Sequence, residues 1–222
     1  MKKICFIIFL NFIIIKNAKA LPDCDKSIHF RDWTNCSGIM ELANGERYNG
    51  EWKNGLKHGK GNLKYSNGEE YEGNFKGGKP YGNGIMKYVD GGKYEGEFKF
   101  GIREGTGIMF WSYGGKYEGE WLNDKVNGKG IATWPDGRRY EGDYENEKRH
   151  GQGTYTWPDG DKYTGGWVKG KFEGYGTYIH ATGHKYVGHF KQGQKNGKGS
   201  YIYPNGKVEK GIWRFDKLIK PE

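Results

Sequence analysis

Cysteine is scarce in this sequence, and the residue patterns of most catalytic sites are missing. Of the three cysteines in 222 residues, only Cys24 and Cys36 lie beyond residue 20, and two cysteines so close together cannot hold a zinc ion alone. No Gly-x-x-x-x-Gly-Lys-Ser/Thr segment occurs, and the many Gly-x-Gly pairs lack the third glycine and the helix of a dinucleotide-binding loop. Serines are few, and no nucleophile, base and orienting group can be assembled. These absences predict a protein that is not an enzyme and uses no metal or cofactor.

A run of about 20 apolar residues, long enough to span a membrane, is also missing. The longest apolar stretch, 4–15, follows Lys2 and Lys3 and precedes the small-residue site Ala18-Lys19-Ala20, which is typical of a bacterial signal peptide. We predict that 1–20 is a signal peptide cleaved after its last alanine, and that the protein is exported to the periplasm or the extracellular space. A retained anchor is the alternative. Removing the four lysines of this segment would lower the net charge from +9 to about +5.

Export would place the two remaining cysteines in an oxidising compartment. Cys24 and Cys36 are close in the sequence, so we predict a disulfide between them that closes a short loop near the new N-terminus. Two free thiols are the alternative.

Glycine is abundant instead, with 40 of 222 residues, several times the usual share of about 7%. The glycines are periodic. Aligned on an opening tyrosine, the chain repeats every 23 residues without insertion or deletion, at Tyr48, Tyr71, Tyr94, Tyr117, Tyr140, Tyr163 and Tyr186. In each copy the third residue is glycine, the fifth is aromatic, and the twelfth and fourteenth are glycine. A fixed period of this length is typical of a repeat protein.

This pattern resembles the MORN repeat, which reads Tyr-x-Gly-x-Trp/Phe, a variable stretch, Gly-x-Gly and an Asp-Gly or Asn-Gly turn. The resemblance covers 48–208 as seven complete repeats. Residues 21–47 are then an N-terminal cap with the disulfide and a half-repeat, and 209–222 a C-terminal half-repeat cap. The resemblance implies protein–protein association or attachment to a membrane surface. The main departures replace the eighth-place glycine in expected loops, at Asp124, Glu147 and Asp216.

Proline turns predict the strand register. In Pro135-Asp136-Gly137 and its relatives, proline suits a type I turn and glycine the left-handed residue after it, giving a three-residue hairpin loop with a bulge. This turn would pair Trp134 with Arg138, Ala132 with Tyr140, Gly130 with Gly142, and Gly128 with Tyr144. A two-residue turn, the alternative, would shift the pairing by one. Because a single copy cannot bury enough surface to fold alone, the copies must stack. We predict an all-β fold, a single-layer twisted antiparallel meander of about fifteen strands.

Side chains alternate along a strand, so this register places the opening tyrosines, the fifth-place aromatics and the rings of the back strand on one face. The glycines form a lane without side chains, into which neighbouring rings can lean. This face is either only a packing layer or also a binding surface. The candidate binding residues are Tyr94, Phe98, Trp111, Tyr117, Trp121, Trp134, Tyr140, Tyr144, Trp157, Tyr163 and Trp167.

Charge is expected to be segregated. Basic residues gather between the fifth and thirteenth places of each copy, in expected loops, while Glu72, Glu95, Glu118 and Glu141 form a ladder on the face opposite the rings. A candidate basic edge for anionic lipid or acidic partners consists of Lys125, Lys129, Lys148 and Arg149; solvated loop charge is the alternative. His180 and His184 should face each other across a turn, but without an evident third ligand His180 is interpreted as replacing an aromatic ring.

These features predict an exported, non-enzymatic scaffold that holds a protein partner along the aromatic face. A module that binds anionic membrane lipid through basic loops is the alternative. A polysaccharide that stacks on the rings is a third candidate, and the open face or the sheet edges could also pair two copies as a homodimer. Nucleic acid is not expected, because the exported chain would carry only about +5.

Overall fold

The computed structural model describes residues 20–222. The predicted signal peptide, except for Ala20, lies outside the described residues. Within this part of the chain no helix has the length and apolar character needed to cross a membrane. One 3-10 turn, η1 (Phe30–Asp32), precedes the strands. The strands are β1 (Cys36–Glu41), β2 (Arg47–Lys53), β3 (Leu56–Lys64), β4 (Glu70–Lys76), β5 (Lys79–Lys87), β6 (Lys93–Lys99), β7 (Ile102–Phe110), β8 (Lys116–Leu122), β9 (Lys125–Thr133), β10 (Arg139–Glu145), β11 (Lys148–Thr156), β12 (Lys162–Val168), β13 (Lys171–Ile179), β14 (Lys185–Lys191), β15 (Gln194–Ile202), β16 (Val208–Arg214) and β17 (Lys217–Pro221).

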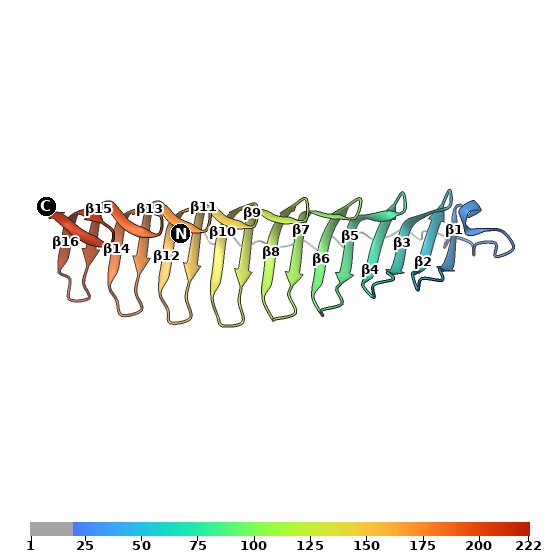
Figure 1. The fold of residues 1–222 in the computed structure, drawn as a ribbon, viewed down its shortest axis with the longest axis horizontal. Helices are drawn as coiled ribbons and strands as arrows, with labels where there is room; N and C mark the ends of the chain where they lie inside the picture. The colour runs from blue at the N-terminus through green and yellow to red at the C-terminus, as the bar shows by residue number, and fades with distance from the viewer. Residues whose placement is uncertain (1–19) are drawn as a thin grey trace.

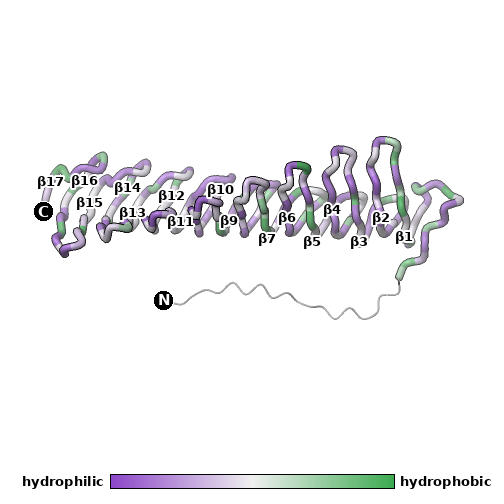
Figure 2. The backbone as a smooth tube through the Cα atoms, turned by 90° about the horizontal axis from the view of Figure 1, so that it is seen from below, coloured by the Kyte–Doolittle hydropathy of each residue, from purple (hydrophilic) through white to green (hydrophobic). Residues whose placement is uncertain are grey.

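Each strand pairs with its neighbours in sequence, so β1 to β17 form one antiparallel meander, seen as a long ribbon in Figure 1 and Figure 2. The predicted all-β meander is confirmed. The sheet has 17 strands rather than about fifteen, because the half-repeats at both ends also pair: β1 joins β2, and β17 joins β16.

The proline turns set the register as predicted. At the turn between β9 and β10, the Gly137 N–H donates to the Trp134 carbonyl at 3.0 Å, and the Trp134 N–H donates to the Arg138 carbonyl at 2.9 Å. Gly137 has a φ of 90°, the left-handed conformation that the bulged turn requires. The pairs that follow are Ala132 with Tyr140, Gly130 with Gly142, and Gly128 with Tyr144.

The other end of each hairpin is a two-residue turn, not the longer loop expected from the basic residues. Both turn residues have positive φ, for example 47° at Asn146 and 66° at Glu147, which is the type I′ geometry that matches strand twist. Glycine takes the second place in most of these turns because it adopts positive φ without strain. Glu147 has the same left-handed conformation, which costs energy for a residue with a side chain. Most of the basic stretch is therefore strand.

Every hairpin also bends, a feature that the repeat pattern does not reveal. Along β9 the twelfth-place Gly128 has a φ of 63°, and the register between β8 and β9 shifts just after Gly119. Beyond this bulge the hairpins fold over along one long edge of the ribbon (Figure 1). The bend gives the sheet an inner face, which holds the buried rings, and an outer face.

The N-terminal segment covers the free edge of β1. Cys24 and Cys36 form the predicted disulfide, and the Cys24 N–H donates to the Ser37 carbonyl at 2.8 Å. Trp33 packs edge-on against Trp52, with 5.3 Å between ring centroids. The row of unpaired backbone groups on β1 is thus partly satisfied by the chain itself.

Candidate functional site

Most of the predicted aromatic face is the core of the protein. Eight of the eleven candidate residues are between 0% and 9% exposed: Tyr94, Phe98, Tyr117, Trp121, Tyr140, Tyr144, Tyr163 and Trp167. The remaining three, Trp111, Trp134 and Trp157, are half-buried and pack against that core. The shared face is as expected, but the bend encloses most of its rings. A binding role for these residues stays a prediction, and the half-buried tryptophans have the exposed surface for it.

The opening tyrosines are buried because each ring lies on the glycine lane. The Tyr117 ring covers Gly119 and Gly130, where any added Cβ would overlap it. Its hydroxyl donates to the Glu120 carbonyl at 2.9 Å. Trp121 and Tyr144 pack edge-on against its two sides, each 5.4 Å away between ring centroids. Burial raises the pKa of the Tyr117 hydroxyl well above its ordinary value.

The exposed part of the inner face is a row of rings beside the proline turns. These eighteenth-place residues, here called the ring strip, are each half-buried. Trp111 stacks on Tyr113, and the Arg138 guanidinium lies over Trp134, 5.5 Å from the ring centroid. The strip consists of Tyr65, Tyr88, Trp111, Trp134, Trp157, His180 and Tyr203.

A second row on the inner face was not anticipated. The tenth-place residues lie directly across from the fifth-place aromatics, as Arg149 does from Tyr144 and Lys195 from Phe190. They alternate between basic and apolar residues, so the basic ones recur every second repeat. That alternation is visible in the sequence and could have found the row. It consists of Lys57, Pro80, Arg103, Val126, Arg149, Phe172, Lys195 and Leu218.

The four residues of the predicted basic edge do not lie together. Lys125 and Lys148 are exposed and begin β9 and β11 directly after two-residue turns. Lys129 forms an ion pair with Asp143 at 2.9 Å, and the Arg149 side chain lies on the inner face over Trp167, 4.5 Å from the ring centroid. A role for these four in lipid binding stays a prediction.

His180 occupies an aromatic place, as interpreted from the sequence, and faces His184 with 6.4 Å between ring centroids. Its Nδ1 is 3.2 Å from an Asp161 carboxylate oxygen, which also accepts the Tyr178 hydroxyl at 2.7 Å. Burial acts to raise the pKa of Asp161, but these hydrogen bonds and one from the Ala181 N–H together hold it below the ordinary value. Among residues 20–222 no three His, Cys, Asp or Glu side chains are arranged to hold a metal ion.

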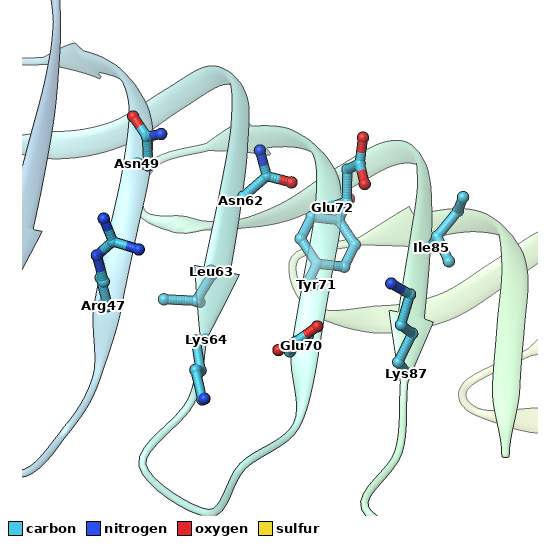
Figure 3. Close-up of a pocket in the computed structure, with 10 residues that line it drawn as sticks. All are labelled: Arg47, Asn49, Asn62, Leu63, Lys64, Glu70, Tyr71, Glu72, Ile85 and Lys87. Atoms are coloured by element: carbon cyan, nitrogen blue, oxygen red, sulfur yellow. The ribbon is translucent and has the colours of Figure 1, made fainter. Parts of the chain in front are cut away.

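The outer face carries a shallow pocket of mixed charge near β2 to β5 (Figure 3). Arg47, Lys64 and Lys87 project from it beside Glu70 and Glu72. With acids set between the bases, this pocket favours neither an anion nor a cation, and the inner face remains the better candidate site.

The MORN repeat family model matches seven consecutive segments, 48–70, 71–93, 94–116, 117–138, 140–162, 163–185 and 186–208. These matches cover more than half of the chain, which therefore belongs to the MORN repeat family. None of the curated proteins compared with the chain matches it.

Distant matches among solved structures include two domains of CPAP proteins. The TCP domain of Drosophila melanogaster SAS-4 (dCPAP), solved with a proline-rich motif of Ana2 (dSTIL), is 17% identical, with 80% of this chain and 90% of that chain covered and a TM-score of 0.44. The TCP10 domain of Danio rerio CPAP is 12% identical, with 78% and 82% covered and a TM-score of 0.46. Staphylococcus aureus virginiamycin B lyase is 14% identical, with 80% and 55% covered and a TM-score of 0.18. Identities this low do not transfer a function.

Proposed function

We propose that this MORN-repeat protein is an exported, non-enzymatic scaffold that holds a protein partner along the ring strip. The observation that carries the proposal is the division of the inner face: rings at the first and fifth places are enclosed, whereas Trp111, Trp134 and Trp157 keep part of their surface in water. Tryptophan is enriched among the few residues that dominate the binding energy of protein interfaces, because its ring presents a large area at a small cost in conformational entropy.

The test is crosslinking in the native cell envelope, comparing the wild type with a variant in which Trp111, Trp134 and Trp157 are all alanine. We expect a specific partner that is lost in the triple variant. Tyr175→Ala is the matched control, because Tyr175 is 61% exposed and lies opposite His189, on the outer face. A partner retained by the triple variant, or lost equally in the control, would contradict the proposal.

Export rests on the pattern of residues 1–20 and is supported by the Cys24–Cys36 disulfide, since such bonds persist in oxidising compartments. N-terminal sequencing of the mature protein should begin at Leu21, and cell fractionation should place it outside the cytoplasm. An intact Met1 in a cytoplasmic fraction would refute this part of the proposal.

Membrane-surface binding is a second candidate, favoured by one exposed apolar rim. Near the two-residue turns of β2 to β7, Leu56, Phe100 and Ile102 are 40% to 49% exposed. Exposed lysines flank this rim at positions 53, 76, 79 and 99, a combination suited to apolar insertion next to anionic headgroups.

Liposome flotation with phosphatidylserine vesicles tests this candidate. Binding should fall as salt rises, and Phe100→Ser with Ile102→Ser should weaken it. Phe215→Ser is the matched control, since Phe215 is 66% exposed at the equivalent turn position of β16 and β17. Equal binding by all variants, or none by the wild type, would remove the candidate.

A further inference from the structure

The inner face repeats with the spacing of an extended peptide. One repeat spans two strands, and strands lie about 4.8 Å apart, so equivalent side chains recur about every 9.6 Å along the ribbon. A polyproline II helix has three residues per turn and rises about 3.1 Å per residue, or about 9.3 Å per turn. A peptide in this conformation, lying across the strands, would therefore present every third side chain to successive repeats.

The cations of the tenth-place row are not equivalent. Lys57 forms an ion pair with Glu46. Arg103 donates through Nε to Asp124 at 3.0 Å and through Nη2 to the Asp124 carbonyl at 2.8 Å. These two positive charges near the N-terminal end are neutralised by the chain itself.

Arg149 lacks such a partner. Asp124 stands at the eighth place of the repeat that follows Arg103. The same place in the repeat that follows Arg149 is Gly170, and the Arg149 guanidinium donates to the Gly170 carbonyl at 3.2 Å. It lies over the rings of Tyr155 and Trp167, at 4.8 and 4.5 Å from their centroids. Its side chain has no carboxylate within 4 Å among residues 20–222, although it is only half-buried.

Lys195, two repeats further on, has Asp216 at the place equivalent to Asp124, but its ammonium group forms no ion pair with it within 4 Å. Its ammonium group lies 4.9 Å from the Tyr201 centroid and 5.1 Å from the Trp213 centroid. The nearby Asp216 carboxylate accepts the backbone N–H of Lys195 at 2.8 Å, and no ion pair of the ammonium forms in the described chain. Burial lowers the pKa of Lys195, and the negative charge of Asp216 acts in the opposite direction.

Between these two cations the same row presents Phe172. Its half-buried ring stacks on Tyr163 at 3.8 Å between centroids and contacts Trp157 of the ring strip at 6.1 Å. The row thus reads cation, ring, cation at equal steps of about 9.6 Å.

We propose that this stretch of the inner face binds an acidic polyproline II segment of a partner protein, with the pattern Glu-x-x-Pro-x-x-Glu. The two glutamates, about 18.6 Å apart in that helix, pair with Arg149 and Lys195, and the central proline packs on Phe172. The inference rests on the proposed scaffold function and names the chemistry of its partner. It differs from a membrane role, because it uses the inner face and not the turn rim.

Fluorescence anisotropy with the labelled peptide Glu-Pro-Ala-Pro-Pro-Ala-Glu tests the proposal on the full mature chain. Replacing both glutamates by glutamine should weaken binding by at least tenfold, as expected for losing charge-assisted contacts. Moving the second glutamate one residue closer to the first should weaken binding similarly, because its side chain then points to another side of the polyproline II helix. Changes in the peptide leave the protein fold untouched, so equal binding of the three peptides would overturn the proposal.

On the protein side, Arg149→Met should weaken the acidic peptide about tenfold. Arg103→Met is the matched control: it removes an equivalent stacked guanidinium that already pairs with Asp124, and binding should not change. Equal losses in the two variants would count against the proposed site. If no peptide binds while the crosslinked partner still depends on Trp134, this inference fails and the scaffold proposal stands. If the peptide binds through Arg149 but crosslinking of the partner does not depend on the ring strip, the scaffold proposal fails instead.

Discussion

Replacing Gly130 by alanine should destabilise the centre of the ribbon severely, although the change adds one methyl group. A Cβ at this position would stand 2.5 Å from Cε2 and 2.6 Å from Cζ of Tyr117, and closer still to its hydroxyl oxygen. Favourable contacts between carbon atoms lie at about 3.5–4.0 Å. The Tyr117 ring is 1% exposed and has rings packed on both sides, so it has no room to move within the core.

The magnitude follows from what the ring would lose. Expelling it exposes roughly 200 Å² of buried surface, about 5 kcal/mol at about 25 cal/mol per Å², and breaks its hydrogen bond to Glu120, worth about 1 kcal/mol. Partial repacking lowers the loss towards the roughly 1–3 kcal/mol of ordinary overpacking. For Gly130→Ala we expect a loss of about 4 kcal/mol.

Urea unfolding followed by circular dichroism and tryptophan fluorescence measures this loss, with the m-value reporting whether the repeats still unfold together. Gly137→Ala is the control. Its φ of 90° penalises alanine, but the nearest atom to the new Cβ is 3.8 Å away, so only about 1–2 kcal/mol should be lost. In a Tyr117→Ala background, Gly130→Ala should cost little. Equal losses at Gly130 and Gly137 would refute the role of the glycine lane.

Three further predictions concern the turns, the tyrosines and the cap. Glu147→Gly should raise the free energy of unfolding by about 1 kcal/mol in urea, because Glu147 has a φ of 66°; a loss would show that its side chain stabilises the turn. Burial, together with the nearby Asp216 charge, raises the pKa of Tyr186 to about 12. The stability that comes from keeping the Tyr186 hydroxyl protonated is complete below about pH 10 and is lost as the pH rises towards 12. Phenolate absorbance at alkaline pH should therefore appear together with unfolding. Gradual ionisation of a folded protein would contradict this. Reducing the Cys24–Cys36 disulfide should cost up to about 3 kcal/mol and increase hydrogen exchange in β1 rather than in the central repeats; a uniform increase along the ribbon would be inconsistent with a local cap.

The register and the shared face of the rings could be predicted because they depend on local chemistry. The proline turn at Pro135-Asp136-Gly137 admits one bulged geometry, and that geometry alone sets which residues lie opposite each other for the rest of the strand. The period of the glycines then fixes where a ring can lie flat on the backbone. Both predictions need only neighbouring residues, and both are confirmed.

The bend could not be predicted in the same way. Each repeat has glycine at its twelfth and fourteenth places, and the sequence alone does not distinguish the structural roles of the two. Gly130 lacks a side chain so that Tyr117 can lie on it, whereas Gly128 has a φ of 63° at a bulge. Only the second changes the direction of the strands. Because the bend was not foreseen, rings such as Tyr117 were expected on an open face and are instead enclosed.

The bend also explains why the variable positions of the repeat are the better place to look for recognition. A ring at the first place must lie on two glycines in every copy, so that place tolerates no change within 48–208 and is almost inaccessible to a partner. The tenth place lies across from the fifth-place rings but outside their tightest packing, and it accepts arginine, valine or phenylalanine in successive copies without altering the strand pairing. A repeated fold can give each copy a different preference at variable places of this kind, which include the ring strip. In the proposed binding mode, the order of cations and rings along the tenth-place row selects the segment that the ribbon holds, while the invariant places keep those side chains at a constant spacing.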